Sequence, residues 1–161
     1  MTVFDKDLPA LAGGVLPAAD LEGRAVLVVN VASKCGLTSQ YEGLERLQKR
    51  YGDRGFTVLG VPSNQFAEQE PGDAEEIQSF CRLTYGTTFP LTEKLEVNGR
   101  RRHSLYEHLI DAPDADGVAG DVDWNFEKFL VAPSGAVAAR FRPQVDPESD
   151  QIVAAIEANL P

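Results

Sequence analysis

Continuous apolar runs in this chain alternate with segments in which apolar residues recur every three or four positions. Residues 26–33, VLVVNVAS, form a β-branched apolar run that is typical of a central strand covered on both faces. A helix is predicted next, because Ser39 and Glu42 resemble a capping box and apolar residues then recur at helical spacing up to Tyr51. Residues 56–63, FTVLGVPS, predict a second strand. In such a βαβ unit the two strands are expected to be parallel.

Two further helices are predicted in the middle of the chain. A loop at residues 64–73 precedes the first of them, whose expected N-cap is Asp73. Its apolar stripe includes Cys81, and the helix is expected to end near Gly86. Residues 103–110 show the spacing of another amphipathic helix.

The last part of the chain predicts a hairpin and a closing helix. Residues 124–141 form two strand patterns around the turn signal Pro133-Ser134-Gly135, which favours antiparallel pairing. Apolar residues at helical spacing follow from Ile152 to Leu160. This order of elements predicts one α/β domain over residues 1–161, with a central mixed β-sheet flanked by helices on both faces, a pattern shared by thioredoxin folds.

Charge and composition narrow the range of partners. The formal net charge is -10 at pH 7, so phosphates of nucleic acids and anionic membranes are repelled. No apolar run approaches the roughly 18 to 20 residues that a spanning helix needs, and residues 1–14 do not resemble a secretory signal. We therefore expect a cytoplasmic protein with no nucleic-acid partner and no membrane insertion.

Cys35 is the first candidate for chemistry. It follows the predicted strand at 26–33 and precedes a helix, which is where open α/β sheets place their sites. Free backbone N–H groups, the helix dipole and the charge of Lys34 favour a thiolate there, and a thiolate can attack an O–O bond. Position alone also fits a small buried residue at a tight turn. The sequence Cys35-Gly36-Leu37-Thr38 has no second cysteine two residues on, which disfavours a thioredoxin-type disulfide exchanger.

Peroxide cleavage also needs hydrogen-bond donors that stabilise the departing oxygen. Trp124 and Asn125, at the start of the predicted hairpin, and a glutamine in the loop after the second strand are neutral donors of this kind. Taken singly, such residues are more often structural. His103 and His108 are not spaced for one helical face, and no nucleotide-binding motif is present, so neither a metal nor an organic cofactor is expected.

Four sequence blocks together resemble the glutathione peroxidase family. They are NVASKCGLT at 30–38, VPSNQFAEQEPG at 61–72, FCRLTYGTTFP at 80–90 and WNFEKFL at 124–130. The resemblance extends over almost the whole chain. It implies a thioredoxin fold and reduction of hydrogen peroxide or organic hydroperoxides.

The resemblance also implies specific roles for residues of these blocks. The catalytic tetrad of the family falls on Cys35, Gln69, Trp124 and Asn125. Cys35 is then the residue that attacks the peroxide, while the other three polarise it and support the thiolate. Asn64 and Gln65 belong to the same motif, where we expect them to shape the loop.

A second cysteine suggests how the enzyme is reset. In similar cysteine-containing members, a cysteine in the helix after the QEPG loop resolves the sulfenic acid, and Cys81 occupies that block. The resemblance thus implies a Cys35–Cys81 disulfide that thioredoxin, rather than glutathione, reduces. From periodicity alone Cys81 is a core residue, because it shares an apolar stripe with Ile77. The helix around Cys81 is therefore expected to unwind in part after Cys35 is oxidised.

Two further points concern the whole protein: its oligomeric state, and whether it acts as an enzyme or as a peroxide sensor. The short segment before Trp124 lacks the longer insertion of tetrameric members of the family, so a monomer is expected. The same two cysteines also fit a peroxide sensor that passes oxidation to a partner protein. Turnover with thioredoxin separates the enzyme from the sensor.

Overall fold

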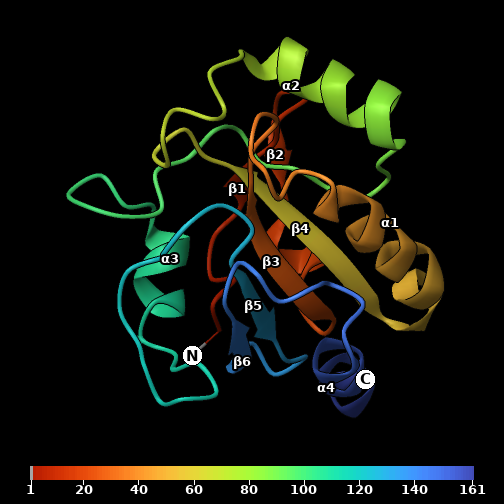
Figure 1. Ribbon diagram of the computed structural model, residues 1–161. Coiled ribbons are helices and arrows are strands. Elements are labelled where there is room, and N and C mark those ends of the chain that lie inside the picture. The colour runs from red at the N-terminus through yellow and green to blue at the C-terminus, as the bar shows by residue number, and fades with distance from the viewer. Residues whose placement is uncertain (1) are drawn as a thin grey trace.

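A mixed four-stranded β-sheet forms the centre of the protein in a computed structural model that describes residues 2–161 (Figure 1). The strand order is β4-β3-β5-β6, where β3 pairs parallel with β4 and antiparallel with β5, and β5 pairs antiparallel with β6. These pairings confirm the predicted parallel βαβ unit and the predicted hairpin. The strands are β3 (Ala25–Val31), β4 (Phe56–Pro62), β5 (Lys128–Val131) and β6 (Val137–Phe141).

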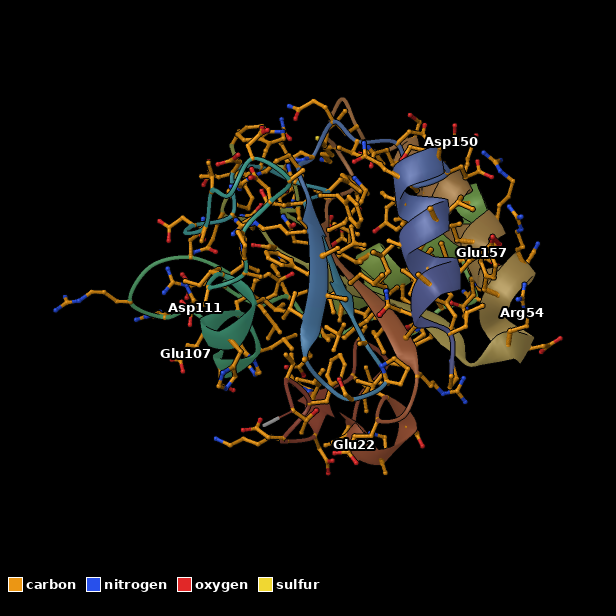
Figure 2. All side chains as sticks on the ribbon, turned by 90° about the horizontal axis from the view of Figure 1, so that it is seen from below. Glu22, Arg54, Glu107, Asp111, Asp150 and Glu157 are labelled. Atoms are coloured by element: carbon orange, nitrogen blue, oxygen red, sulfur yellow. The ribbon has the colours of Figure 1, made fainter. Side chains whose placement is uncertain are left out.

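Helices cover both faces of this sheet, as the sequence predicts. The four α-helices are α1 (Gln40–Tyr51), α2 (Ala74–Phe80), α3 (Ser104–Leu109) and α4 (Asp150–Asn159). Figure 2 shows α4 alongside α1 on one face of the sheet and α3 on the opposite face. Successive residues of β3 alternate between the faces, because Leu27 packs in the α1 and α4 cluster and Val28 in the α3 cluster. Both are fully buried, which explains the continuous apolar run.

Short elements complete the chain. A small antiparallel hairpin near the N-terminus is formed by β1 (Leu8–Pro9) and β2 (Val15–Leu16). Two 3-10 turns, η1 (Ala18–Asp20) and η2 (Gly52–Arg54), precede β3 and β4. Within residues 2–161 no helix is long and apolar enough to cross a membrane.

The helix that carries Cys81 begins and ends as predicted but changes from α-helical to π-helical geometry along its length. Asp73 caps α2, since its carboxylate accepts the N–H of Glu76 at 2.9 Å. After Phe80 the chain continues as a π-helical segment, η3 (Cys81–Tyr85), and ends at Gly86 in the left-handed region with φ 60°. Figure 1 shows α2 at the top of the molecule, beyond the carboxyl end of β4.

Two local predictions are wrong. The side chain of Ser39 makes no cap hydrogen bond, because Ser39 is already helical (φ -60°, ψ -15°) and the turn before α1 is closed by the Gln40 N–H donating to the Leu37 carbonyl at 2.9 Å. The strand predicted from residue 124 begins only at Lys128. Phe126 adopts a φ of 68°, which breaks the extended backbone and leaves Trp124 and Asn125 in a loop.

Candidate active site

Cys35 lies in a tight loop that connects β3 to α1 and is partly exposed. The hydroxyl of Thr38 accepts the Cys35 N–H at 2.9 Å and donates to the carbonyl of Ala32 at 2.9 Å. Thr38 is buried, and its bond to Ala32 lies away from solvent, whereas its bond to the Cys35 N–H is partly buried. A single side chain therefore holds the backbone of the cysteine against the end of the strand.

The sulfur of Cys35 faces a backbone donor. The N–H of Leu37 points at Cys35 Sγ at a donor–acceptor distance of 3.3 Å. A backbone N–H in this position stabilises negative charge on sulfur. One of the backbone N–H groups expected at this turn thus faces the sulfur.

The loop between β4 and α2 is attached to the Cys35 loop along its backbone. The N–H of Lys34 donates to the carbonyl of Gln69 at 3.0 Å, and the N–H of Ser33 donates to Glu70 Oε1 at 3.1 Å. Gln69 is thereby placed beside the residue that precedes Cys35. Burial raises the pKa of the Glu70 carboxyl, which is only 1% exposed.

The side chains of Gln69 and Asn125 are in direct contact. Asn125 Nδ2 donates to Gln69 Oε1 at 2.9 Å, although 56 positions separate the two residues in the chain. Asn125 is fully buried and its Oδ1 has no partner among the described residues. The structure therefore brings three members of the expected tetrad into one connected region, through the Gln69 backbone bond to the Cys35 loop and this amide pair.

Asn30 positions the fourth member, Trp124. Asn30 Nδ2 donates to the Trp124 carbonyl at 3.0 Å, and its Oδ1 accepts the Glu127 N–H at 3.2 Å. The Asn30 carbonyl accepts the Phe126 N–H at 2.7 Å. The Trp124 ring packs on Phe66, with centroids 5.7 Å apart. Sequence reasoning missed Asn30, whose signal was a polar residue in an otherwise apolar strand.

Asn64 and Gln65 accept backbone N–H groups of their own loop and of the segment before α3, and no bond joins their side chains to Cys35 within residues 2–161. Asn64 Oδ1 accepts the Glu70 N–H at 2.9 Å. Gln65 Oε1 accepts the N–H groups of Val97 and Asn98 at 2.6 and 3.0 Å. These bonds connect the loop to its own end and to the segment before α3.

Cys81 is 1% exposed and lies at the junction of α2 and η3. Its thiol donates to the hydroxyl of Tyr41, with 3.4 Å between Sγ and Oη. Burial raises the pKa of this thiol. Both cysteines are free thiols, so the position of Cys81 is that of the reduced protein.

A cavity of about 320 Å³ opens between the Cys35 loop and α2. Lys34 lines it together with the apolar side chains of Ile77 and Phe80 on α2. Its lining includes Lys34, the residue before Cys35, but none of the four residues of the expected tetrad. Its lining residues are Ser33, Lys34, Glu70, Pro71, Gly72, Glu76, Ile77 and Phe80.

Comparison with known proteins gives consistent results at the level of sequence. The profile of the glutathione peroxidase family matches residues 3–110. Hydroperoxy fatty acid reductase gpx1 of Synechocystis is 47% identical over 164 residues, covering 99% of this chain and 96% of the relative. Thioredoxin/glutathione peroxidase BtuE of Escherichia coli is 45% identical over 179 residues, with the same coverage of 99% and 96%.

Solved structures agree with this result. The crystal structure of Trgpx in apo form has a TM-score of 0.74 at 37% identity, covering 100% of this chain and 99% of that one. A thiol:disulfide interchange protein of the thioredoxin family from Chlorobium tepidum has a TM-score of 0.66 at 20% identity, covering 96% and 92%. The second likeness concerns the fold alone and confirms the predicted thioredoxin fold.

Proposed function

This chain belongs to the glutathione peroxidase family and is a thiol peroxidase that reduces hydroperoxides, and on that basis we propose that Cys35 attacks the peroxide. The observation that carries this proposal is the backbone donor from Leu37 to Cys35 Sγ, in a loop to which Gln69 is attached. Cys35 is partly exposed, whereas the thiol of Cys81 is buried and is not accessible to substrate. Cys35 is thus the better nucleophile of the two.

The first step transfers one oxygen to sulfur. The Cys35 thiolate attacks the distal oxygen of the hydroperoxide, so that an S–O bond forms while the O–O bond breaks. The departing hydroxide or alkoxide takes up a proton and leaves as water or alcohol. We assign its stabilisation to the amide of Gln69, the indole N–H of Trp124 and the amide of Asn125, which are neutral donors and offer no rival nucleophile.

The second step forms a disulfide with Cys81. The Cys81 sulfur attacks the sulfenic sulfur of Cys35, the S–S bond forms, and the hydroxyl leaves as water with the proton of the Cys81 thiol. A disulfide needs Cα atoms within about 7 Å, and Cys81 is buried against Tyr41 in the reduced protein. We therefore propose that the α2 and η3 segment opens before the bond forms.

Thioredoxin is the reductant that we propose for this disulfide. The E. coli relative carries both thioredoxin and glutathione in its name, and the Synechocystis relative is named for hydroperoxy fatty acids. We accordingly propose hydrogen peroxide and organic hydroperoxides, including those of fatty acids, as substrates. The cycle is proposed for a monomeric single domain over residues 1–161 in the cytoplasm, where thioredoxin is kept reduced.

Coupled consumption of NADPH tests these assignments. Wild-type protein, Cys35→Ser and Cys81→Ser are each compared with thioredoxin plus its reductase and with glutathione plus its reductase. We expect turnover with thioredoxin for wild type, none for Cys35→Ser, and one peroxide equivalent without thioredoxin turnover for Cys81→Ser, since the sulfenic acid still forms.

Other outcomes of this assay contradict specific parts of the proposal. Equal turnover with glutathione would remove thioredoxin as the preferred reductant. Full thioredoxin turnover by Cys81→Ser would remove the resolving role of Cys81. Oxidation without turnover, followed by mixed-disulfide formation with one client, would favour the peroxide sensor.

A further inference from the structure

Tyr41 and Cys81 form a buried hydrogen-bonded pair. Tyr41 is fully buried in α1, and the 3.4 Å bond to Cys81 is the only hydrogen bond of its hydroxyl within residues 2–161. Burial raises the pKa of the Tyr41 phenol well above its usual value, so the phenol stays protonated at neutral pH. Each side chain therefore contacts the other as a neutral group shielded from water.

The ring of Tyr41 also holds the segment on which Cys81 lies. Tyr85 of η3 stacks on it with centroids 5.3 Å apart, and Phe80 of α2 meets it edge-on at 6.4 Å. Phe126 of the loop after Trp124 also packs edge-on against this ring, with centroids 5.5 Å apart. One residue of α1 thus contacts the segment that has to move and the loop that carries two of the proposed donors.

We propose that Tyr41 is a positioning residue that holds Cys81 in the closed, reduced fold and sets the rate at which it reaches oxidised Cys35. This inference rests on the proposed resolving role of Cys81. The Tyr41 hydroxyl holds the Cys81 thiol by the hydrogen bond, and the Tyr41 ring holds α2 and η3 by its contacts with Phe80 and Tyr85. Opening of α2 and η3 breaks the hydrogen bond and the aromatic contacts together.

We call this hold of Tyr41 on Cys81 the latch, and the chemistry gives it a functional reason. While Cys81 is held, it stays away from the sulfenic acid, so Cys35 oxidation and disulfide formation are separate steps. When the segment opens, the Cys81 sulfur bonds to Cys35 and water leaves with the thiol proton and the sulfenic hydroxyl. The population of the open segment then determines the second rate without changing the first.

Tyr41→Phe tests the latch because it removes the hydroxyl and keeps the ring. After one pulse of hydrogen peroxide, acid-quenched thiol alkylation and intact mass follow the disulfide, while a dimedone probe follows the sulfenic acid. Loss of one buried hydrogen bond is expected to speed disulfide formation roughly two- to fivefold and to leave sulfenic acid formation unchanged. A purely structural role would not separate the two rates.

Opening can also be measured without peroxide. In Cys35→Ser, Cys81 is the only thiol, and its alkylation by N-ethylmaleimide reports exposure of the segment. Adding Tyr41→Phe is expected to raise this alkylation rate by the same factor. Tyr106→Phe is the matched control, because Tyr106 is also fully buried and packs on the other face of the sheet. Its hydroxyl has no hydrogen-bond partner among the described residues.

The outcomes separate the latch from the proposed function. If wild-type protein forms no Cys35–Cys81 disulfide, the resolving role fails. If the disulfide forms and Tyr41→Phe forms it at the same rate or more slowly, the latch alone is overturned. Should Tyr41→Phe not fold, Tyr85→Leu removes the stacked ring from the moving segment, and an unaccelerated disulfide there overturns the latch equally.

Discussion

Asn30 shows how one polar residue in a buried strand can organise an active site. It is fully buried, and its side chain bonds to backbone groups of Trp124 and Glu127 from the end of β3. Cys35 follows five positions later on the same strand's exit loop. Asn30 thereby fixes the distance between the nucleophile's loop and the segment that carries Trp124 and Asn125.

Asn30→Ala is expected to lower both stability and the rate of peroxide reduction. The change leaves the Trp124 carbonyl and the Glu127 N–H without partners in the core, which costs about 2 to 4 kcal/mol of unfolding free energy. Urea denaturation measures the stability, and the single-turnover rate with hydrogen peroxide measures the chemistry. Asn159→Ala is the control, since the Asn159 side chain donates to the Ala155 carbonyl of its own helix α4. An unchanged single-turnover rate in Asn30→Ala would contradict the positioning role.

At the scale of elements, strand β6 holds the long segment between α3 and β5. The Arg140 guanidinium is fully buried and donates to the carbonyls of Ala112, Gly120 and Asp121 at 3.0, 2.9 and 3.0 Å. Its Nε donates to Glu127 Oε2 at 2.7 Å. Arg140 thus helps to hold a segment without helix or strand that lies directly before the residues of the site. Arg142 also holds this segment, since it donates to Asp114 Oδ2 at 2.9 Å and to the Val118 carbonyl at 3.1 Å.

Arg140→Met is expected to destabilise the protein by about 3 to 5 kcal/mol, because it removes the buried ionic partner of Glu127 and the donor to three carbonyls. Glu127 then keeps the weaker ionic contact with Arg142, at 3.2 Å. Arg46→Met is the comparison, since both side chains of its salt bridge with Glu148 are largely exposed, at 60% and 39%, and solvent screening leaves such a pair little effect on stability. Chemical denaturation measures the loss of unfolding free energy in both variants. A loss for Arg140→Met no larger than that for Arg46→Met would show that the segment does not depend on this contact.

At the scale of the whole molecule, Lys128 links global stability to pH. Its side chain is buried in β5 and its Nζ donates to the carbonyls of Phe126 and Pro143 at 2.6 and 3.1 Å. Burial lowers the pKa of Lys128 to about 7, partly offset by the negative charges of Asp146 and Glu127. In the unfolded chain the pKa is about 10.4. Above pH ~7 the unfolded state therefore binds a proton that the folded state lacks, and stability rises with pH.

The comparison of wild type with Lys128→Met isolates this effect. Wild-type unfolding free energy is expected to gain about 2 kcal/mol relative to the variant between pH 6.5 and pH 9, because only the wild type carries this titration. Urea denaturation at both pH values provides the measurement. A difference between the two proteins that stays constant with pH would contradict the lowered pKa.

Much of the fold was determined by local pattern. The apolar run at 26–33 and the helical spacing up to Tyr51 predicted β3 and α1, because burial on both faces and burial on one stripe leave different periods in a sequence. The Asp73 cap was predictable for the same reason, since its bond reaches only three residues along the chain. The four family blocks indicated Cys35 and its partners in the expected tetrad.

Tertiary structure alone decided how these parts meet. The Gln69 to Asn125 bond and the Tyr41 to Cys81 bond join residues 56 and 40 positions apart, and no period in the sequence encodes such contacts. The φ of 68° at Phe126 ended the predicted strand for a similar reason, because that backbone is held by the distant carbonyl of Asn30. Sequence periodicity reports which face of an element is buried, whereas the partner that buries it is set by the packing of the whole chain.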